Sequence, residues 1–238
     1  MTPGLVKSFS NWHSRTGLAP RVLLELVEVL ACPRCGPPQG LIVLVDRLAE
    51  RRVVEGRLDC PNCESRFPID AGVVSFGMSE SEDRVETRAP AANSGHAEPS
   101  RAVLLAALLG LHEATGYVLL GPGLEELAED LTDLAARIEF LLLSAAQSAS
   151  LKGGESFSRV SIVCGTQPGR LPLLNNRLAG AGLASASPEL CLAAYATIRT
   201  GANLVVLDPL PGTEALLDGA GAQVLAAESR AIAVRRGY

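Results

Sequence analysis

Hydrophobic and polar positions follow different patterns in the two parts of this chain. Near the start, apolar residues at helical spacing predict a short amphipathic helix over residues 21–31. Apolar runs separated by turn residues then predict four strands, at 41–45, 52–58, 67–70 and 72–76. These elements form a unit of about 60 residues, which is too small to hold a secure hydrophobic core without a further staple.

Beyond residue 101, predicted helices and strands alternate. The apolar pattern predicts helices at 101–115, 124–134, 187–199 and 213–218. Buried runs between and after these helices predict strands at 117–120, 138–143, 160–164, 204–207, 223–227 and 231–235. Such alternation predicts a doubly wound α/β sheet, here ending in an antiparallel hairpin.

Two segments have no apolar period. Residues 1–19 are polar apart from a few residues such as Phe9 and Trp12, which are candidate anchors for a partner or parts of a loose tail. Residues 78–100 are rich in Ser, Glu, Pro and Ala, a composition typical of a flexible linker. We therefore expect an N-terminal arm over 1–19, a small domain over 20–77, a linker over 78–100 and an α/β domain over 101–238.

Two Cys-Pro-x-Cys steps are the strongest chemical signal. They place four candidate ligands in the small domain: Cys32, Cys35, Cys60 and Cys63. Two such pairs framing hairpin strands are the ligand set of a tetrahedral zinc ribbon. The alternatives are four unconnected cysteines or a redox Cys-x-x-Cys, but redox chemistry needs one such motif between a strand and a helix. Four thiolates leave zinc no position for a reacting water, so we expect a structural Zn²⁺.

Composition limits the partners and the compartment. Hydrophobic residues make up 47 % of the chain and the net charge is −5, which gives no case for nucleic-acid binding. No apolar run reaches the roughly 18 residues of a membrane span. The N-terminus lacks the apolar region of a signal peptide, and zinc thiolates suit a reducing compartment. We therefore expect a cytoplasmic protein, with Cys164 and Cys191 as buried thiols.

The first unit resembles the Trm112-like zinc-ribbon family over about residues 22–77. The matching stretches are LLELVEVLACPRCG and RLDCPNCESRFPIDAGVVSF. In that family the ribbon binds and stabilises a class I methyltransferase, as a separate subunit or fused to it. The resemblance thus implies a protein-docking module.

The second unit resembles class I methyltransferases that use S-adenosylmethionine, over about residues 103–236. Its closing part, PELCLAAYATIRTGANLVVLDPLPGTEALLDGAGAQVLAAESRAIAVRR, is similar to the family's last helices, strands and hairpin. Gly121-Pro122-Gly123 lies where the family has its glycine-rich cofactor loop. Together the two resemblances imply a small zinc-ribbon β-hairpin domain joined to a Rossmann-like doubly wound sheet of class I methyltransferase type.

The chain departs from that family where the cofactor is held. Leu119 stands in place of the acid before the glycine loop, and Glu125 in place of its third glycine. The second strand ends in leucines, with Glu139 as the nearby substitute for the ribose-binding acid. Thr166 and Ala179 replace two further acids. The resemblance therefore implies a degenerate cofactor site at Gly121, Gly123, Glu139 and Thr166, and makes S-adenosylmethionine binding doubtful.

Asp208 is the one acid at the expected carboxyl end of a strand. It is the catalytic candidate if the protein is an enzyme, and a strand-terminating Asp-Pro turn otherwise.

Three functions follow from these observations. The first is a non-catalytic methyltransferase-like protein, a pseudoenzyme that serves as a scaffold or subunit in a larger assembly. The second is an active methyltransferase of a small molecule with an unusual cofactor pocket. The third is a regulatory module whose ribbon docks a separate methyltransferase. The absence of the expected cofactor-binding acids favours the first of these functions.

Overall fold

The structure is a computed structural model, and it describes residues 22–77, 100–144, 159–164 and 170–237. The predicted arm and nearly all of the predicted linker lie outside the described residues. No helix within the described ranges is long and apolar enough to cross a membrane.

The N-terminal unit is a small antiparallel sheet preceded by one turn of 3-10 helix. The long hairpin of β2 and β3 is its centre, and β4 extends the sheet from β3 to β5. Its elements are β1 (Val22–Leu23), η1 (Leu24–Glu28), β2 (Ile42–Ala49), β3 (Arg52–Asp59), β4 (Arg66–Asp70) and β5 (Val73–Ser75).

The C-terminal unit is a doubly wound sheet, as predicted. Its strands run in the spatial order β8-β7-β6-β9-β10-β12-β11, and all pairs are parallel except those that β12 makes with β10 and β11. Its strands are β6 (Gly116–Leu120), β7 (Ile138–Ser144), β8 (Val160–Cys164), β9 (Leu178–Ala184), β10 (Ile198–Leu207), β11 (Ala222–Glu228) and β12 (Ala231–Arg236). Its helices are α1 (Arg101–Leu109), η2 (Glu125–Leu127), α2 (Ala128–Leu134), α3 (Pro188–Thr197) and α4 (Thr213–Gly219).

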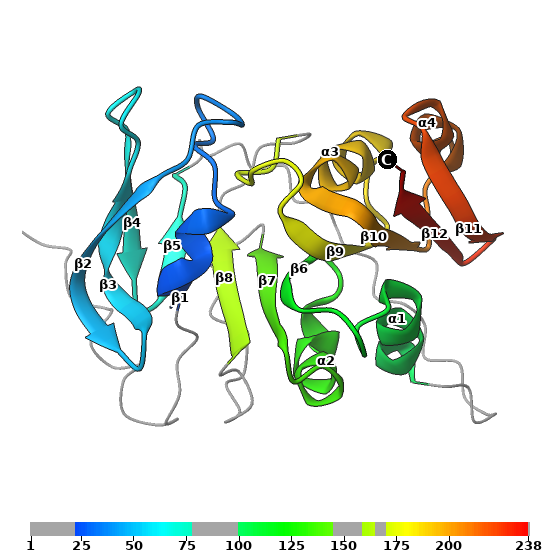
Figure 1. The fold of residues 1–238 in the computed structure, drawn as a ribbon, viewed down its shortest axis with the longest axis horizontal. Helices are drawn as coiled ribbons and strands as arrows, with labels where there is room; N and C mark the ends of the chain where they lie inside the picture. The colour runs from blue at the N-terminus through cyan, green and yellow to red at the C-terminus, as the bar shows by residue number, and fades with distance from the viewer. Residues whose placement is uncertain (1–21, 78–99, 145–158, 165–169, 238) are drawn as a thin grey trace, which may run out of the picture.

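The two units share one continuous sheet. β5 of the ribbon pairs in parallel with β8 of the α/β unit, with Val73 opposite Ile162 and Ser75 opposite Cys164. The ribbon strands therefore extend the doubly wound sheet at the β8 edge, as Figure 1 shows. A second contact is an antiparallel bridge between Leu30 and Leu173.

Two hydrophobic cores lie on opposite faces of the sheet. Helices α1 and α2 cover one face, whereas α3 and α4 cover the other (Figure 1). Leu26 and Leu30 of the ribbon are fully buried in the second core, with Leu119 of β6 and Leu141 of β7. The ribbon thus covers part of a face that crossover helices normally cover in a doubly wound sheet.

The connection from β8 to β9 helps to explain this arrangement. Its described part, residues 170–177, contains no helix. Instead, the Ala31 N–H donates to the Pro172 carbonyl at 2.9 Å, and the Leu174 N–H donates to the Val29 carbonyl at 2.8 Å. Ribbon and crossover therefore satisfy each other's backbone groups across the units.

The helix predicted over 21–31 is confirmed only as the short 3-10 helix over Leu24–Glu28. The described part of that segment is β1 followed by the short η1, because Val22 and Leu23 pair with Val53 and Arg52 of β3. Pairing with a neighbouring strand outweighs the local helical spacing.

Other boundaries shift for local reasons. The helix predicted over 101–115 ends at Leu109, because Gly110 adopts a left-handed conformation with φ of 69°. The helix predicted over 187–199 ends at Thr197, since Ile198 already pairs with Leu178 as the start of β10. Ala179 lies inside β9, a strand that the apolar pattern did not predict. The strand predicted over 204–207 begins earlier, at Ile198, and the other predicted strands and α4 are confirmed within a few residues.

Gly56 marks a close approach of two backbones in the β2–β3 hairpin. A Cβ at this position would lie 2.4 Å from the Leu44 carbonyl oxygen. We expect Gly56→Ala to lower the free energy of unfolding by about 1–3 kcal/mol, because the backbone of β2 has to move. Urea denaturation measures the shift, and Gly40→Ala, where a Cβ meets nothing within 4 Å, is the control. Equal stabilities of the two variants would contradict this prediction.

Candidate functional site

The four cysteines of the Cys-Pro-x-Cys steps sit on two matching turns, at residues 32–36 and 60–64, which we call the first and the second knuckle. The Gly36 N–H donates to the Cys32 carbonyl at 2.8 Å, and the Glu64 N–H donates to the Cys60 carbonyl at 3.0 Å. Gly36 and Glu64 both have positive φ angles, of 74° and 56°. Each turn thus folds its Cys-Pro-x-Cys step so that both sulfurs face inward.

The sulfurs form one cluster. All four Sγ atoms lie within 4.8 Å of one another. The sulfur of Cys32 lies 3.6 Å from that of Cys63, and the sulfur of Cys35 lies 3.8 Å from that of Cys60. A tetrahedron with Zn–S bonds of about 2.3 Å has edges of about 3.8 Å. The spacing and the soft donor set therefore fit a tetrahedral Zn²⁺.

The surroundings of the sulfurs are asymmetric. Cys32 and Cys60 are buried, Cys35 is half-buried and Cys63 is exposed. Burial raises the pKa of Cys32 to about 12, whereas hydrogen bonding with the side chain and backbone of Ser65 lowers the pKa of Cys63 to about 6. Asn62 also donates to the Cys35 sulfur at 3.3 Å. These donors are the kind of outer contact that orients thiolate ligands.

The glycine loop after β6 is closed by the chain itself. A Cβ on Gly121 would lie 2.3 Å from the Leu183 side chain, so the loop packs directly against β9. Gly123 has a φ of 83°, and its N–H donates to the Glu125 carboxylate at 2.7 Å. A loop N–H of the kind that could meet a ligand therefore already has an intramolecular acceptor.

The neighbouring strands present leucines to the cores. Leu119, Leu141 and Leu142 are fully buried. Glu139 is the second residue of β7 and lies near the amino end of the strand, whereas cofactors of doubly wound sheets bind beyond the carboxyl ends. Its carboxylate is bound by Arg52 of the ribbon. Thr166 lies outside the described residues.

Asp208 directly follows β10, as predicted, and it has two unusual features. Its φ is 47°, and its carboxylate accepts a hydrogen bond from Arg101 at 3.1 Å. Ser185, which directly follows the adjacent strand β9, also has a positive φ, of 48°, and its N–H donates to the Leu207 carbonyl. Two non-glycine residues in left-handed conformations thus lie at neighbouring strand ends.

A cavity of about 340 Å³ lies elsewhere, between the first knuckle and α3. Pro33, Cys35, Arg170 and Ala193 are among its lining residues. The glycine loop does not contribute to it.

Sequence reasoning missed several residues whose polar contacts join distant parts of the chain. Arg52, Arg101, Ser161 and Ser185 each belong to contacts with residues far away in the chain. Nothing in their local sequence marks them, because single polar residues at strand ends are common in any α/β protein. Only Glu139 was singled out from the sequence, as a lone acid next to a run of leucines, but the partner predicted for it was the ribose of a cofactor.

Comparison with known proteins supports the first resemblance. Residues 24–72 match the sequence model of Trm112p-like proteins. This match covers the first knuckle, the β2–β3 hairpin, the second knuckle and β4. A search of curated proteins found no match to the chain.

Solved structures with a similar arrangement include several methyltransferases. A predicted O-methyltransferase from Agrobacterium tumefaciens is 15 % identical and aligns with 58 % of this chain and 81 % of its own, with a TM-score of 0.45. An O-methyltransferase family protein from Burkholderia thailandensis is 10 % identical over 57 % of this chain and 55 % of its own, with a TM-score of 0.46. Human N-acetylserotonin methyltransferase, solved with S-adenosylmethionine, is 18 % identical over 58 % of this chain and 51 % of its own, with a TM-score of 0.45. The chain therefore spans only about half the length of the latter two proteins.

The α/β unit has the doubly wound sheet and the closing antiparallel hairpin that the second resemblance implies. Residues 24–72 thus match the model of Trm112p-like proteins and hold a cluster of four cysteines, and this part of the chain is joined through one sheet to a doubly wound α/β unit.

Proposed function

We propose that this chain is a non-catalytic methyltransferase-like protein that acts as a scaffold or structural subunit. A structural Zn²⁺ held by Cys32, Cys35, Cys60 and Cys63 stabilises its ribbon. In this proposal the α/β unit keeps the architecture of a methyltransferase without a working cofactor site.

The contact between Glu125 and Gly123 carries the proposal. Glu125 takes the place of a glycine and lends its carboxylate, at 2.7 Å, to the Gly123 N–H. A bound cofactor that needed this N–H would have to displace a charged acceptor that is part of the chain. The other expected acids give no replacement: Leu119 is buried in the core, and Glu139 is engaged by Arg52.

Calorimetric titration of S-adenosylmethionine into the zinc-loaded, full-length chain tests the proposal. We expect no saturable heat up to about 1 mM ligand. Each loss of about 1.4 kcal/mol of binding free energy raises the Kd tenfold, so the loss of several ligand contacts moves a micromolar Kd beyond that range. Glu125→Gly frees the Gly123 N–H and is the matched variant. A gain of binding in this variant alone would support the view that Glu125 occupies the Gly123 N–H in place of a ligand. Low-micromolar binding by the wild-type chain would contradict the proposal.

One observation favours a second candidate, an active methyltransferase. Asp208 and Ser185 hold left-handed backbone conformations at the ends of neighbouring parallel strands. Strained non-glycine residues cluster at functional sites, and substrates of doubly wound sheets bind at this edge. Cofactor binding by the wild-type chain, with methyl transfer lost in Asp208→Asn, would favour this candidate.

The third possibility, a ribbon that docks a separate methyltransferase, has less support. The ribbon's β5 is paired on both sides, with β4 and with β8 of the same chain. A separate partner could not use this edge without displacing the chain's own α/β unit.

A further inference from the structure

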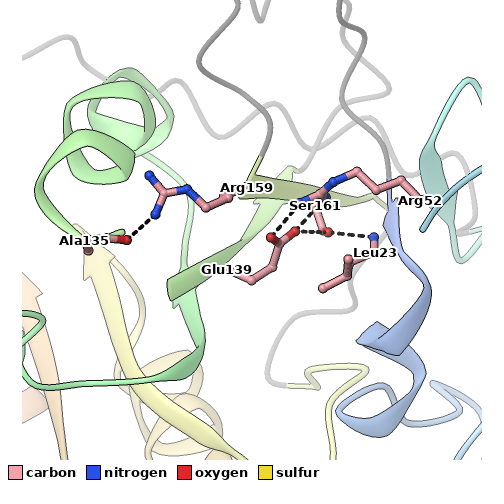
Figure 2. Close-up of polar contacts among 6 residues, drawn as sticks. All are labelled: Leu23, Arg52, Ala135, Glu139, Arg159 and Ser161. Atoms are coloured by element: carbon pink, nitrogen blue, oxygen red, sulfur yellow. Dashed lines mark hydrogen bonds and ion pairs between the residues drawn. The ribbon is translucent and has the colours of Figure 1, made fainter. Parts of the chain in front are cut away.

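A buried ion pair joins the ribbon to the α/β unit. Arg52 is the first residue of β3, and both ends of its guanidinium donate to Glu139 of β7, with Nη1–Oε1 and Nη2–Oε2 distances of 2.8 Å each. The side chains are only 12 % and 9 % exposed. Figure 2 shows the two groups facing each other across the boundary between the units.

Ser161 extends this pair to two further strands. Its hydroxyl donates to Glu139 Oε1 at 2.8 Å and accepts from the Leu23 N–H at 3.2 Å (Figure 2). Ser161 belongs to β8 and is fully buried. We refer to Arg52, Glu139 and Ser161 as the interunit cluster, which connects β1 and β3 of the ribbon to β7 and β8.

The strand pairing between the units is short. β5 meets β8 over only three residue pairs, and every residue of β8 is buried. A slip of two residues keeps the same face of each strand toward the core, so apolar burial alone specifies this register weakly. Something beyond the β5–β8 ladder has to distinguish the correct register from its neighbours.

The interunit cluster contributes to that distinction, beside the backbone hydrogen bonds of Ala31 with Pro172 and of Leu174 with Val29. β3, β4 and β5 are hydrogen-bonded to one another, so a slip of β5 along β8 carries Arg52 with it. Two residues in a parallel ladder correspond to about 7 Å, at 3.3 Å per residue. Such a shift would break the bidentate contact and leave the Glu139 carboxylate buried without its cation, which is strongly unfavourable.

We propose that the interunit cluster fixes the register in which the ribbon docks on β8, so that the α/β unit of the same chain is the specific occupant of the ribbon's docking edge. The inference concerns recognition between the two units and does not depend on whether the α/β unit binds S-adenosylmethionine. Buried charge pairs serve such a role in some proteins, where they add specificity and little net stability.

The test compares single and paired apolar replacements in the zinc-loaded, full-length chain. The variants are Arg52→Met, Glu139→Leu and the combination of both. Arg47→Met is the matched control, because Arg47 forms an equally short pair with Glu55 in the same hairpin, but both side chains are about half exposed. Two quantities are measured: the melting temperature, and the hydrogen exchange of the Phe76 amide, which donates to the Cys164 carbonyl next to the β5–β8 ladder.

We expect each single variant to lower the melting temperature and to speed exchange of the Phe76 amide by about 100-fold or more, because local opening becomes easier. The double variant should recover the melting temperature of the wild type. Its Phe76 amide should still exchange at least about 10-fold faster than in the wild type, since apolar contacts tolerate more than one register. Arg47→Met should change neither quantity.

Two results would overturn the proposal. The first is wild-type protection of Phe76 in the double variant, which would mean that shape alone sets the register. The second is single variants that behave like Arg47→Met. If a single variant fails to fold, the comparison of the double variant with the wild type still decides.

Discussion

Stripping zinc from the full-length chain should unfold the α/β unit together with the ribbon. Structural zinc contributes on the order of 10 kcal/mol or more to the folding of small metal-dependent domains. Leu26 and Leu30 lie just before the first knuckle and are fully buried in the core that also holds Leu119 and Leu141. Loss of the knuckles therefore removes part of the packing of the hydrophobic core of the α/β unit. Near-ultraviolet circular dichroism during chelation, followed by zinc addition, measures the loss and its recovery.

Cysteine variants separate the metal from the packing of the thiols. Cys60→Ala should reproduce the effect of chelation, because three thiolates no longer close the tetrahedral site. Cys191→Ala is the control, since Cys191 is equally buried but lies in α3, away from the cluster. If chelation removed hydrogen-exchange protection only within residues 22–77 and left α3 and α4 protected, the two units would be energetically separate and this prediction would fail.

Leu26→Ala should destabilise the whole chain by about 2–5 kcal/mol, the usual cost of removing a buried leucine side chain. Leu26 is 0 % exposed and belongs to η1, yet its core is shared with strands and helices of the α/β unit. Urea denaturation should therefore show a single transition with a lower midpoint and an unchanged slope.

Leu48→Ala is the matched control for this prediction. Leu48 lies on β2 of the same ribbon and is 50 % exposed, so its replacement should change stability by no more than about 0.5 kcal/mol. Two separate transitions in Leu26→Ala, only one of them shifted, would show that the ribbon unfolds independently.

Local patterns predicted the parts of this fold that depend on local interactions. The knuckle cysteines were identified from their spacing, and the sulfurs cluster as tetrahedral coordination requires. The strands at 117–120 and 160–164 were identified because buried β-strands have short, continuous apolar runs. The helix predicted over 21–31 is shorter in the structure than its apolar spacing suggests, because Val22 and Leu23 pair with β3.

The join between the units left no trace in the local sequence. β5 and β8 pair although residues 76–159 separate them, and Arg52 meets Glu139 across a separation of 87 residues. Contacts of this kind depend on which surfaces meet in the folded chain. Glu139 illustrates the consequence: its position next to a leucine run suggested a ribose ligand, whereas its neighbour is an arginine from the ribbon.

The β5–β8 pairing has a consequence for how the assembly is maintained in a cell. When a docking ribbon and its target are separate proteins, the occupied fraction depends on the concentration of each. Here a covalent connection turns docking into an intramolecular step, which does not depend on the concentration of a free partner. The ribbon and the α/β unit are also synthesised in equal numbers. Dilution or unequal expression therefore cannot separate them, and the pairing becomes independent of protein abundance.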